Sequence, residues 1–249
     1  MLNKITSLSN SKIVNYSKLV NPKYRQQSRL FLVEGEKALE DIINNNISVR
    51  DILITDENIL SKFSEGDNVT LVSEQVMKKV ASSTSAPKIL TVAEQKNYDY
   101  TNLISKNRLI LLENISDAGN LGTIIRDAVA FGFEGIILLG DCVDLYNPKV
   151  IRSAAGNFFK IPVIKIKELN NEFENFKIYT TYLHSDKSTF ADEIVPAEKF
   201  ILSFGSEAGG LSENFMKNSS ENVVIKTKDV ESLNIATSAA ILMYEFSKH

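Results

Sequence analysis

Short apolar runs alternate with amphipathic stretches along the first hundred residues. We predict strands at LFLV, VRDILIT, NVTLV and KILTVAE, each of which has turn-forming neighbours. Helices are predicted at GEKALEDIINN, ENILSKF and SEQVMKKVA, after a basic helical segment at the beginning of the chain. This alternation indicates a small α/β layer domain over residues 1–97, and the polar stretch at 98–107 predicts a linker.

From residue 108 the same alternation is stronger. We predict strands at RLILLE, GIILLG, IPVIKI, KIYTTYL, KFILSFG and NVVIKT. Strands that are apolar almost throughout and alternate with helices indicate a parallel sheet that is covered on both faces, here over residues 108–249. The last helix, NIATSAAILMYEF, is apolar nearly all round, so it is buried inside the fold or against a second subunit. We favour the subunit interface.

The stretch NLGTIIRDAVAFGF, residues 120–133, predicts a helix with one exceptional polar position. Its apolar residues follow the i, i+3, i+4, i+7, i+8 spacing of a buried stripe: Leu121, Ile124, Ile125, Ala128 and Val129. Arg126 lies about 140° from the centre of that stripe, at roughly 100° per residue. A guanidinium on the opposite face is either a ligand-binding group or half of a surface salt bridge, with Glu207 or with Asp127 of a neighbouring subunit.

Composition excludes several classes of protein. No apolar run approaches the ~18 residues of a membrane span, and the N-terminus lacks the apolar segment of a signal peptide. A single cysteine, Cys142, excludes an internal disulfide and fits a reducing compartment, so we expect a cytoplasmic protein with no membrane partner. With only two histidines, His184 and His249, we expect no metal site, and nucleophilic chemistry would depend on His184 alone.

The formal net charge of −3 conceals two basic segments. Residues 1–33 contain six basic and no acidic residues, and residues 145–167 contain five basic and no acidic residues. Segregated positive charge suits a polyanion, because neutralised phosphates release their counterions. Each segment alone is also compatible with an ordinary solvated surface. The two together favour nucleic acid as the partner.

Three loops follow predicted strands, where open α/β sheets bind their ligands. They are ENISDAGNLGT at 113–123, FGSEAGGLS at 204–212 and TKDVESLN at 227–234. Neither a phosphate-binding G-x-x-x-x-G-K-[ST] loop nor a dinucleotide-binding G-x-G-x-x-G loop is present. The second loop offers glycines for close backbone approach together with Glu207, a combination that suits a neutral or cationic ligand. Taken singly, this loop is also compatible with a glycine-rich turn, and Ser232 or Asn234 with ordinary helix capping.

In this order, the motifs resemble those of the SpoU-type RNA ribose 2′-O-methyltransferases of the SPOUT superfamily. The three family motifs are similar to DAGNLGTIIRDAVAFG, LSFGSEAGGLS and VESLNIATSAAILMYE. Between them, YNPKVIRSAAGNFFKIPV is similar to the Asn-Pro-Lys…Arg…Gly stretch of the family. NPKYRQQSRLFLVEGEKALEDII resembles the small RNA substrate-binding domain that many members carry before the catalytic domain.

The resemblance implies S-adenosylmethionine as cofactor, a C-terminal trefoil knot and a homodimer formed through the catalytic domain and the last helix. Rules of chain topology alone would exclude a knot, because threaded chains are almost unknown among folds. The site residues that it implies fall into three groups. The catalytic group comprises Arg126, Asn120, Glu207, Ser232 and Asn234. The cofactor-binding group comprises Gly205, Gly210, Ile225 and Leu233, and the RNA-binding group comprises Lys18, Lys23, Arg25, Arg29, Lys149 and Arg152.

The predicted activity is therefore methyl transfer to a ribose hydroxyl of structured RNA, with ribosomal RNA favoured and transfer RNA as the alternative substrate. The sequence departs from the family pattern at two places. Ile225-Lys226-Thr227 stands where members usually have Ile-Pro-Met, and Pro87-Lys88-Ile89 stands where many have Pro-Gln-Gly. The first departure keeps a non-catalytic RNA-binding or assembly factor on the same fold as an alternative function. A small-molecule enzyme of unrelated α/β type is a third interpretation.

Overall fold

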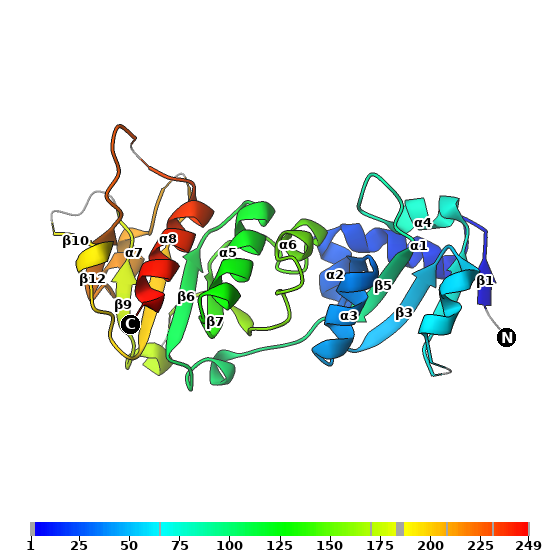
Figure 1. The fold of residues 1–249 in the computed structure, drawn as a ribbon, viewed down its shortest axis with the longest axis horizontal. Helices are drawn as coiled ribbons and strands as arrows, with labels where there is room; N and C mark the ends of the chain where they lie inside the picture. The colour runs from blue at the N-terminus through cyan, green and yellow to red at the C-terminus, as the bar shows by residue number, and fades with distance from the viewer. Residues whose placement is uncertain are drawn as a thin grey trace. The chain divides into compact units, whose positions relative to one another are not determined.

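The computed structural model describes residues 3–64, 66–169, 171–182, 187–207, 209–230 and 232–248. The chain forms two compact units. The N-terminal unit comprises Met1–Lys96 together with Tyr146–Ile151, and the C-terminal unit comprises Asn97–Leu145 and Arg152–His249. Each unit has its own sheet and is described separately below (Figure 1).

The N-terminal unit is a five-stranded mixed sheet with helices. Its strands lie in the order β1-β4-β3-β5-β2, with β1, β4 and β3 parallel and β5 antiparallel to both β3 and β2. The strands are β1 (Asn3–Ile5), β2 (Leu30–Glu34), β3 (Val49–Ile54), β4 (Val69–Val72) and β5 (Ile89–Glu94). The helices are α1 (Ser11–Ser17), η1 (Lys18–Val20), α2 (Pro22–Ser28), α3 (Glu36–Asn44), η2 (Glu57–Lys62) and α4 (Glu74–Val80).

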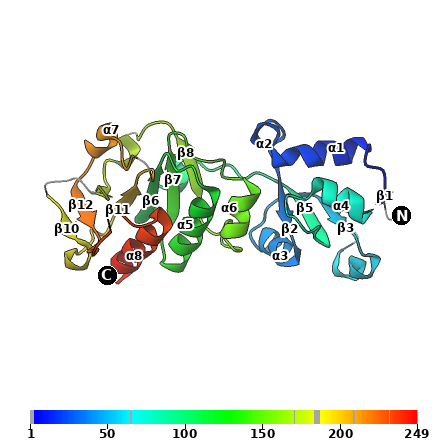
Figure 2. The same ribbon diagram turned by 90° about the horizontal axis from the view of Figure 1, so that it is seen from above.

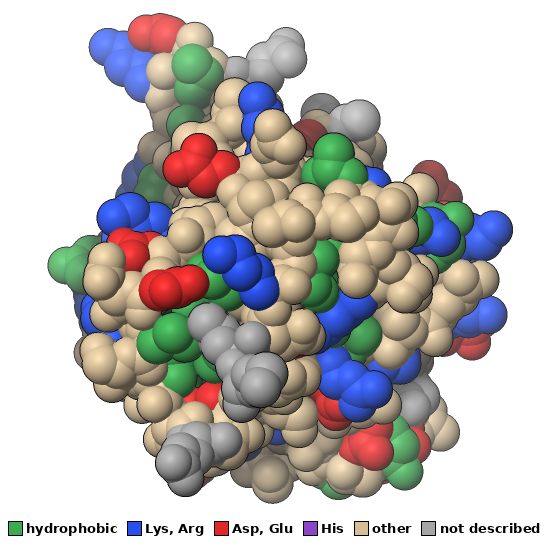
Figure 3. Space-filling view, turned by 90° about the vertical axis from the view of Figure 1, so that its right-hand side faces the viewer, with side chains coloured by type: hydrophobic (Ala, Val, Ile, Leu, Met, Phe, Trp, Pro, Cys, Tyr) green, Lys and Arg blue, Asp and Glu red, His purple; other side chains and the backbone are tan. Residues whose placement is uncertain are grey.

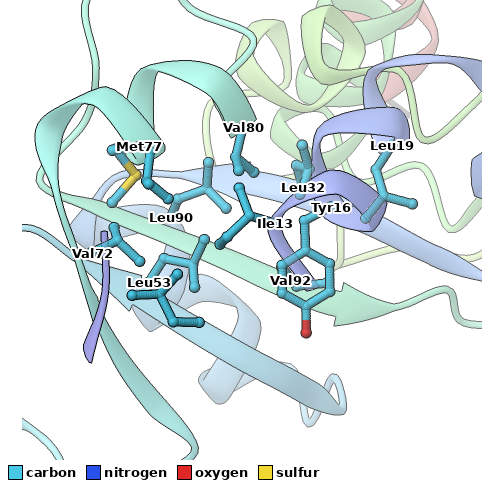
Figure 4. Close-up of a cluster of buried hydrophobic side chains, with 12 residues drawn as sticks. Ile13, Tyr16, Leu19, Leu32, Leu53, Val72, Met77, Val80, Leu90 and Val92 are labelled. Atoms are coloured by element: carbon cyan, nitrogen blue, oxygen red, sulfur yellow. The ribbon is translucent and has the colours of Figure 1, made fainter. Parts of the chain in front are cut away.

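One of the two apolar core clusters of this unit lies between the sheet and helices α1 and α4. Figure 4 shows apolar side chains of both helices pointing toward those of the strands. Ile13 of α1, Met77 of α4 and Leu53 of β3 are fully buried there. Burial of such side chains is worth about 1.5–3 kcal/mol each, and it holds the basic N-terminal helices against the sheet.

A polar cluster is buried beside this core. Asp51 is fully buried, pairs with the ammonium of Lys12, and accepts hydrogen bonds from Tyr16 Oη at 3.0 Å and Thr70 Oγ1 at 3.1 Å. Burial, reinforced by the Asp51 carboxylate, raises the pKa of Tyr16, so its hydroxyl stays protonated and donates. The ammonium of Lys12 therefore neutralises a buried carboxylate of this unit.

The C-terminal unit contains a seven-stranded sheet in the order β10-β12-β9-β11-β6-β7-β8. Every neighbouring pair in the described part of this sheet is parallel, which confirms the predicted parallel α/β architecture. The strands are β6 (Arg108–Glu113), β7 (Gly135–Leu139), β8 (Val163–Ile166), β9 (Lys177–Thr180), β10 (Thr189–Phe190), β11 (Phe200–Phe204) and β12 (Glu221–Val224). The helices are η3 (Tyr100–Asn102), α5 (Ala118–Ala130), η4 (Asn171–Phe173), η5 (Ala191–Glu193), α7 (Glu213–Met216) and α8 (Ile235–Ser247), and α6 (Pro148–Ser153) spans the boundary with the N-terminal unit.

Helices cover both faces of this sheet. Helices α5 and α8 pack side by side on one face, and α7 lies over the other face (Figure 2). Alternate residues of β6 point to opposite faces, so Leu109 and Leu111 pack toward α7 while Ile110 and Leu112 face the α5–α8 layer. Two covered faces explain why the strands read as continuous apolar runs.

Helix α8 buries one side within its own unit. Ala239, Leu242, Met243 and Phe246 are buried, and the ring of Phe246 contacts those of Tyr179 and Phe200. On the outward side, Tyr244 remains 51% exposed. Intramolecular packing therefore accounts for much of the apolar character of the helix. No helix among the described residues is long and apolar enough to cross a membrane.

The structure contains elements that the hydrophobic pattern does not predict. Strands β1 and β10 are only three and two residues long, too short to show an alternating pattern, and each exists because it pairs with a longer strand. The predicted helix at ENILSKF is a 3-10 helix, η2.

Glu34, at the end of β2, makes the N-terminal unit sensitive to acid. Its Oε1 accepts from Ser82 N at 2.6 Å, Ser82 Oγ at 2.8 Å and Ser83 N at 3.3 Å. Burial alone would raise the pKa of Glu34, but the hydrogen bonds from Ser83 and Ser82 outweigh it and hold the pKa below its ordinary value of 4.5.

Because the folded state prefers the ionised Glu34, the stability that this carboxylate contributes is complete above its unfolded pKa and is lost as the pH falls through its folded pKa. We expect Glu34→Gln to lower the melting temperature most at neutral pH, with a difference from wild type that shrinks below about pH 4. Thermal unfolding across this range measures it, with the exposed Glu40→Gln on α3 as control. A constant difference at all pH values would contradict the assignment.

Candidate active site

The segment from β6 to α5 positions the first predicted site residue. Asp117 caps α5, and its Oδ1 accepts a hydrogen bond from the backbone N of Asn120 at 2.8 Å. The cap holds Asn120 in the first turn of the helix, just beyond the carboxyl end of β6. Its side chain thereby reaches the segments that follow β11 and β12.

Hydrogen bonds connect Asn120 to both of the other predicted loops. Asn120 Nδ2 donates to Glu207 Oε1 at 2.7 Å, and Asn234 Nδ2 donates to Asn120 Oδ1 at 3.2 Å. Asn234 also caps α8, because its Oδ1 accepts from Ala236 N at 2.9 Å and Thr237 N at 3.3 Å. The structure thus brings three residues, each from a different sequence motif, into one chain of hydrogen bonds, here called the Asn120 link.

Helix capping was one interpretation of Asn234, and the structure shows that the residue caps α8 and joins the Asn120 link at the same time. Its amide allows this because the oxygen accepts from the helix while the nitrogen donates to Asn120.

The loop after β11 folds back on itself. Ser206 N donates to Gly210 O at 3.1 Å and Gly210 N donates to Ser206 O at 2.8 Å. A Cβ on Gly205 would lie 1.8 Å from the carbonyl carbon of Gly210, so only glycine fits at the beginning of this turn. Gly210 has φ +65°, which also favours glycine. Backbone geometry therefore requires glycine at 205 and favours it at 210.

The segment after β12 carries the remaining predicted cofactor contacts. Ile225 and Leu233 are half-buried, and Ser232 is exposed. At the departure from the family pattern, Lys226 pairs with Asp192 at 3.0 Å and lies 4.4 Å from the ring centroid of Phe190. Both side chains of this ion pair are more than half exposed, so it contributes little to stability.

Arg126 lies on the exposed face of α5, as the helical spacing requires. Among the described residues it forms neither an ion pair nor a hydrogen bond with Glu207, whose Oε1 is held by Asn120 instead. Burial raises the pKa of the neighbouring Asp127, and the positive charge of Arg126 partly offsets that rise. The guanidinium is thus presented to the exterior of α5.

The described residues contain no group of three or more His, Cys, Asp or Glu side chains placed to hold a metal ion. Cys142 is buried, and this burial raises the pKa of its thiol, which disfavours the nucleophilic thiolate. Both histidines, His184 and His249, lie outside the described residues.

The predicted RNA-binding residues differ in exposure. Lys18, Lys23 and Arg29 are exposed on η1, α2 and the residue that follows α2, and the Lys18 ammonium lies 5.4 Å from the ring centroid of Tyr24. Figure 3, which faces the N-terminal unit, shows basic side chains interspersed with acidic ones. Lys149 and Arg152 of α6 are also exposed.

Arg25 requires a correction. Its side chain is only 1% exposed, and Nη1 donates to the carbonyl oxygen of Leu19 at 2.7 Å. Arg25 occupies the inward face of the short helix α2, and the other residues of this helix are exposed. A buried guanidinium cannot reach an RNA phosphate, so Arg25 supports the basic surface from within.

One residue of the site was missed by sequence reasoning. Glu113, the last residue of β6, is 7% exposed and accepts hydrogen bonds from both Ser212 N and Ser212 Oγ. The available signal was an acidic residue directly after the apolar run Leu109–Leu112, at the end of the strand.

Comparison with known proteins identifies both halves of the chain. Residues 107–244 match the SpoU rRNA Methylase family, and residues 10–91 match the MRM3-like substrate binding domain. The chain belongs to the SpoU rRNA methylase family. The resemblance inferred from the three ordered motifs is thereby confirmed.

Relatives of this family are similar over nearly the whole chain. The 23S rRNA (guanosine(2553)-2′-O)-methyltransferase RlmP of Bacillus subtilis is 31% identical, covering 98% of each chain. The 23S rRNA (uridine(2479)-2′-O)-methyltransferase of Streptomyces viridochromogenes is 26% identical, covering 91% of this chain and 85% of its own length. The crystal structure of an AdoMet-bound rRNA methyltransferase from Sinorhizobium meliloti superimposes with a TM-score of 0.89 at 25% identity, covering 100% and 98% of the two chains.

Closure of the loop after β11 depends on Gly205. We expect Gly205→Ala to destabilise the protein by ~1–3 kcal/mol and to accelerate amide exchange at Ser206 and Gly210, because the added methyl group displaces the returning backbone. Thermal unfolding and hydrogen exchange measure the two effects.

Gly209→Ala is the matched control, because a Cβ there would have only Ser206 Oγ nearby, at 3.5 Å. Equal effects of the two substitutions would show that steric exclusion at Gly205 does not define the loop.

Proposed function

We propose that this protein transfers a methyl group from S-adenosylmethionine to a ribose 2′-hydroxyl of ribosomal RNA. Membership of the SpoU family, a substrate-binding domain ahead of the catalytic domain, and relatives named as rRNA 2′-O-methyltransferases support this function. The structural observation that carries it is the Asn120 link, because it joins the three loops that bear the family motifs.

The residues at these loops fit S-adenosylmethionine. Gly205 allows backbone to approach backbone closely, and the described part of the loop at 204–212 contains acidic but no basic side chains. That composition suits a ligand with a positively charged sulfonium better than a nucleotide triphosphate. We assign the cofactor contacts to Gly205, Gly210, Ile225 and Leu233. When bound, the cofactor supplies an activated methyl group.

Asn120, Glu207, Ser232 and Asn234 hold the loops and orient the reacting ribose. Methyl transfer requires the attacking oxygen about 3–3.5 Å from the methyl carbon, so precise positioning supplies much of the rate. The Asn120 link provides such positioning, because its hydrogen bonds hold the loops at fixed positions relative to one another.

Arg126 binds the ribose and the adjacent phosphate and stabilises negative charge as it develops on the attacking oxygen. Its guanidinium remains protonated, since an arginine pKa lies above ~12, so it acts as a cation rather than as the base. The hydroxyl proton passes to phosphate or water. A fixed positive charge where negative charge develops is an effective form of catalysis.

The N-terminal unit, within residues 1–97, recognises the RNA. Its exposed cations Lys18, Lys23 and Arg29 bind phosphates, and Lys149 and Arg152 of α6 add to this function. The target nucleotide lies in an unpaired region, because a duplex gives poor access to a chosen ribose.

The catalytic domain at 108–249 forms a homodimer in which α8 contributes its outward residues, among them the exposed Tyr244. Phe131, at the end of α5, lies 6.0 Å from the Tyr244 ring between centroids and extends the apolar area. The trefoil knot of the SPOUT superfamily stays a prediction for the segment that carries the second and third motifs.

Replacement of Arg126 tests the catalytic assignment. We expect Arg126→Ala to retain S-adenosylmethionine affinity and to lose methylation by ~10²-fold or more, because charge stabilisation acts mainly in the transition state. Calorimetry measures cofactor binding, and transfer of a labelled methyl group to the RNA measures activity.

Lys217→Ala removes an exposed cation of the C-terminal unit that lies outside both basic segments, and it serves as control. Near-normal turnover of Arg126→Ala would refute the catalytic role. If the wild type binds no S-adenosylmethionine at millimolar concentration, the function is instead that of a non-catalytic RNA-binding factor.

Removal of the N-terminal cations tests the RNA surface. We expect the triple variant Lys18→Gln, Lys23→Gln and Arg29→Gln to bind RNA more weakly and to reduce the slope of log affinity against log salt by about 2, since each single-strand phosphate contact contributes about 0.7. Fluorescence anisotropy at several salt concentrations measures the slope.

A control triple variant replaces exposed lysines elsewhere in the same unit, namely Lys37, Lys78 and Lys88, with glutamine. It removes the same charge, so an equal loss of slope in both variants would show that net charge, rather than this surface, binds the RNA.

A further inference from the structure

Glu113 is a buried acidic residue at the carboxyl end of β6, next to the site. It ends β6, whose preceding residues Leu109–Leu112 are fully buried and apolar. Among the described residues of the C-terminal unit, it is the one buried side chain of an acidic or basic type. Burial of a carboxylate is unfavourable unless its oxygens are hydrogen-bonded, so its partners indicate what it does.

Both oxygens of this carboxylate bind one residue. Oε2 accepts from the backbone N of Ser212 at 2.7 Å, and Oε1 accepts from Ser212 Oγ at 2.6 Å. The same Oγ accepts from Phe215 N at 3.2 Å and thereby caps α7. Glu113 therefore holds the point at which the loop after β11 ends and α7 begins.

The loop between β11 and α7 is held at three points. At its beginning, Phe204 of β11 pairs with Leu112 of β6, directly before Glu113. In its middle, Asn120 binds Glu207 at 2.7 Å. At its end, Glu113 binds Ser212. All three partners belong to one continuous segment, β6 and the first turn of α5, so the loop and Asn120 share a common support.

We propose that Glu113 is a positioning residue for the cofactor: its carboxylate fixes the end of the loop at 205–212 so that Gly205 and Gly210 present their backbone to S-adenosylmethionine. The inference rests on the proposed function for the identity of the ligand. Hydrogen bonds to a carboxylate are stronger than those between neutral groups, and removal of Glu113 takes this acceptor away from the amide of Ser212.

Glu113→Ala and Glu113→Gln separate positioning from mere stability. We expect Glu113→Ala to raise the dissociation constant and the KM for S-adenosylmethionine by about 10-fold or more, with kcat at saturating cofactor changed only a few-fold. Glu113→Gln should restore binding to within a few-fold of wild type, because its amide oxygen accepts from Ser212 N and its amide nitrogen donates to Ser212 Oγ. Calorimetry and steady-state kinetics give these values.

Glu134→Ala is the matched control. Glu134 Oε2 accepts from the backbone N of Asn107 at 2.8 Å and of Arg108 at 3.2 Å, at the opposite end of β6. Its loss removes a carboxylate–backbone contact from the same strand, so it should lower the melting temperature without changing cofactor affinity. Unchanged affinity in Glu113→Ala, or an equal loss in Glu134→Ala, would overturn the proposal.

Ser212→Ala keeps the test valid if Glu113→Ala does not fold. It removes the Oγ bond to Glu113 and the Oγ cap that accepts from Phe215 N, whereas Ser212 N still reaches Glu113, and we expect a several-fold rise in the dissociation constant. Wild-type affinity in this variant, with Glu113→Ala unfolded, would assign Glu113 to folding alone. Failure of the proposed function is distinguishable, because the wild type itself would then bind no S-adenosylmethionine.

Discussion

The candidate site depends on one amide. Asn120 donates to Glu207 and accepts from Asn234, so a single side chain holds loops that are 87 and 114 residues away in sequence. An amide can do this because it carries a donor and an acceptor side by side, whereas a carboxylate at the same position could only accept. The backbone N of Asn120 is itself held by Asp117, which makes the start of α5 the fixed point of the site.

The parallel sheet brings these loops within reach of one another. In a parallel sheet the carboxyl ends of all strands lie at one edge, and β6 and β11 are neighbours there. Glycine at 205 lets the chain reverse directly at this edge, and the last helix returns to pack beside α5. Arg126 then stands on the exposed face of the helix that supports the site, separate from the bonds that hold the loops.

In the basic N-terminal segment, packing decides which positive charges are available at the surface. All six basic side chains before residue 33 looked equivalent as a source of positive potential. The fold uses Lys12 to neutralise the buried Asp51 and encloses Arg25 against the carbonyl of Leu19. Lys18, Lys23 and Arg29 stay at the surface, so the region that can attract a polyanion is smaller than the sequence indicates.

Hydrophobic periodicity by itself determined the main strands and helices, because a strand covered on both faces and a helix covered on one have different patterns of apolar residues. The order of the motifs determined the family. Only the tertiary structure decided which side chains meet. Strand order, which the pattern does not encode, brings Glu113 within hydrogen-bond distance of Ser212, and Asn120 within reach of both Glu207 and Asn234. The short strands β1 and β10 likewise depend on pairing with strands that are distant in sequence. The burial of Arg25 depends on which face of its helix packs against the unit.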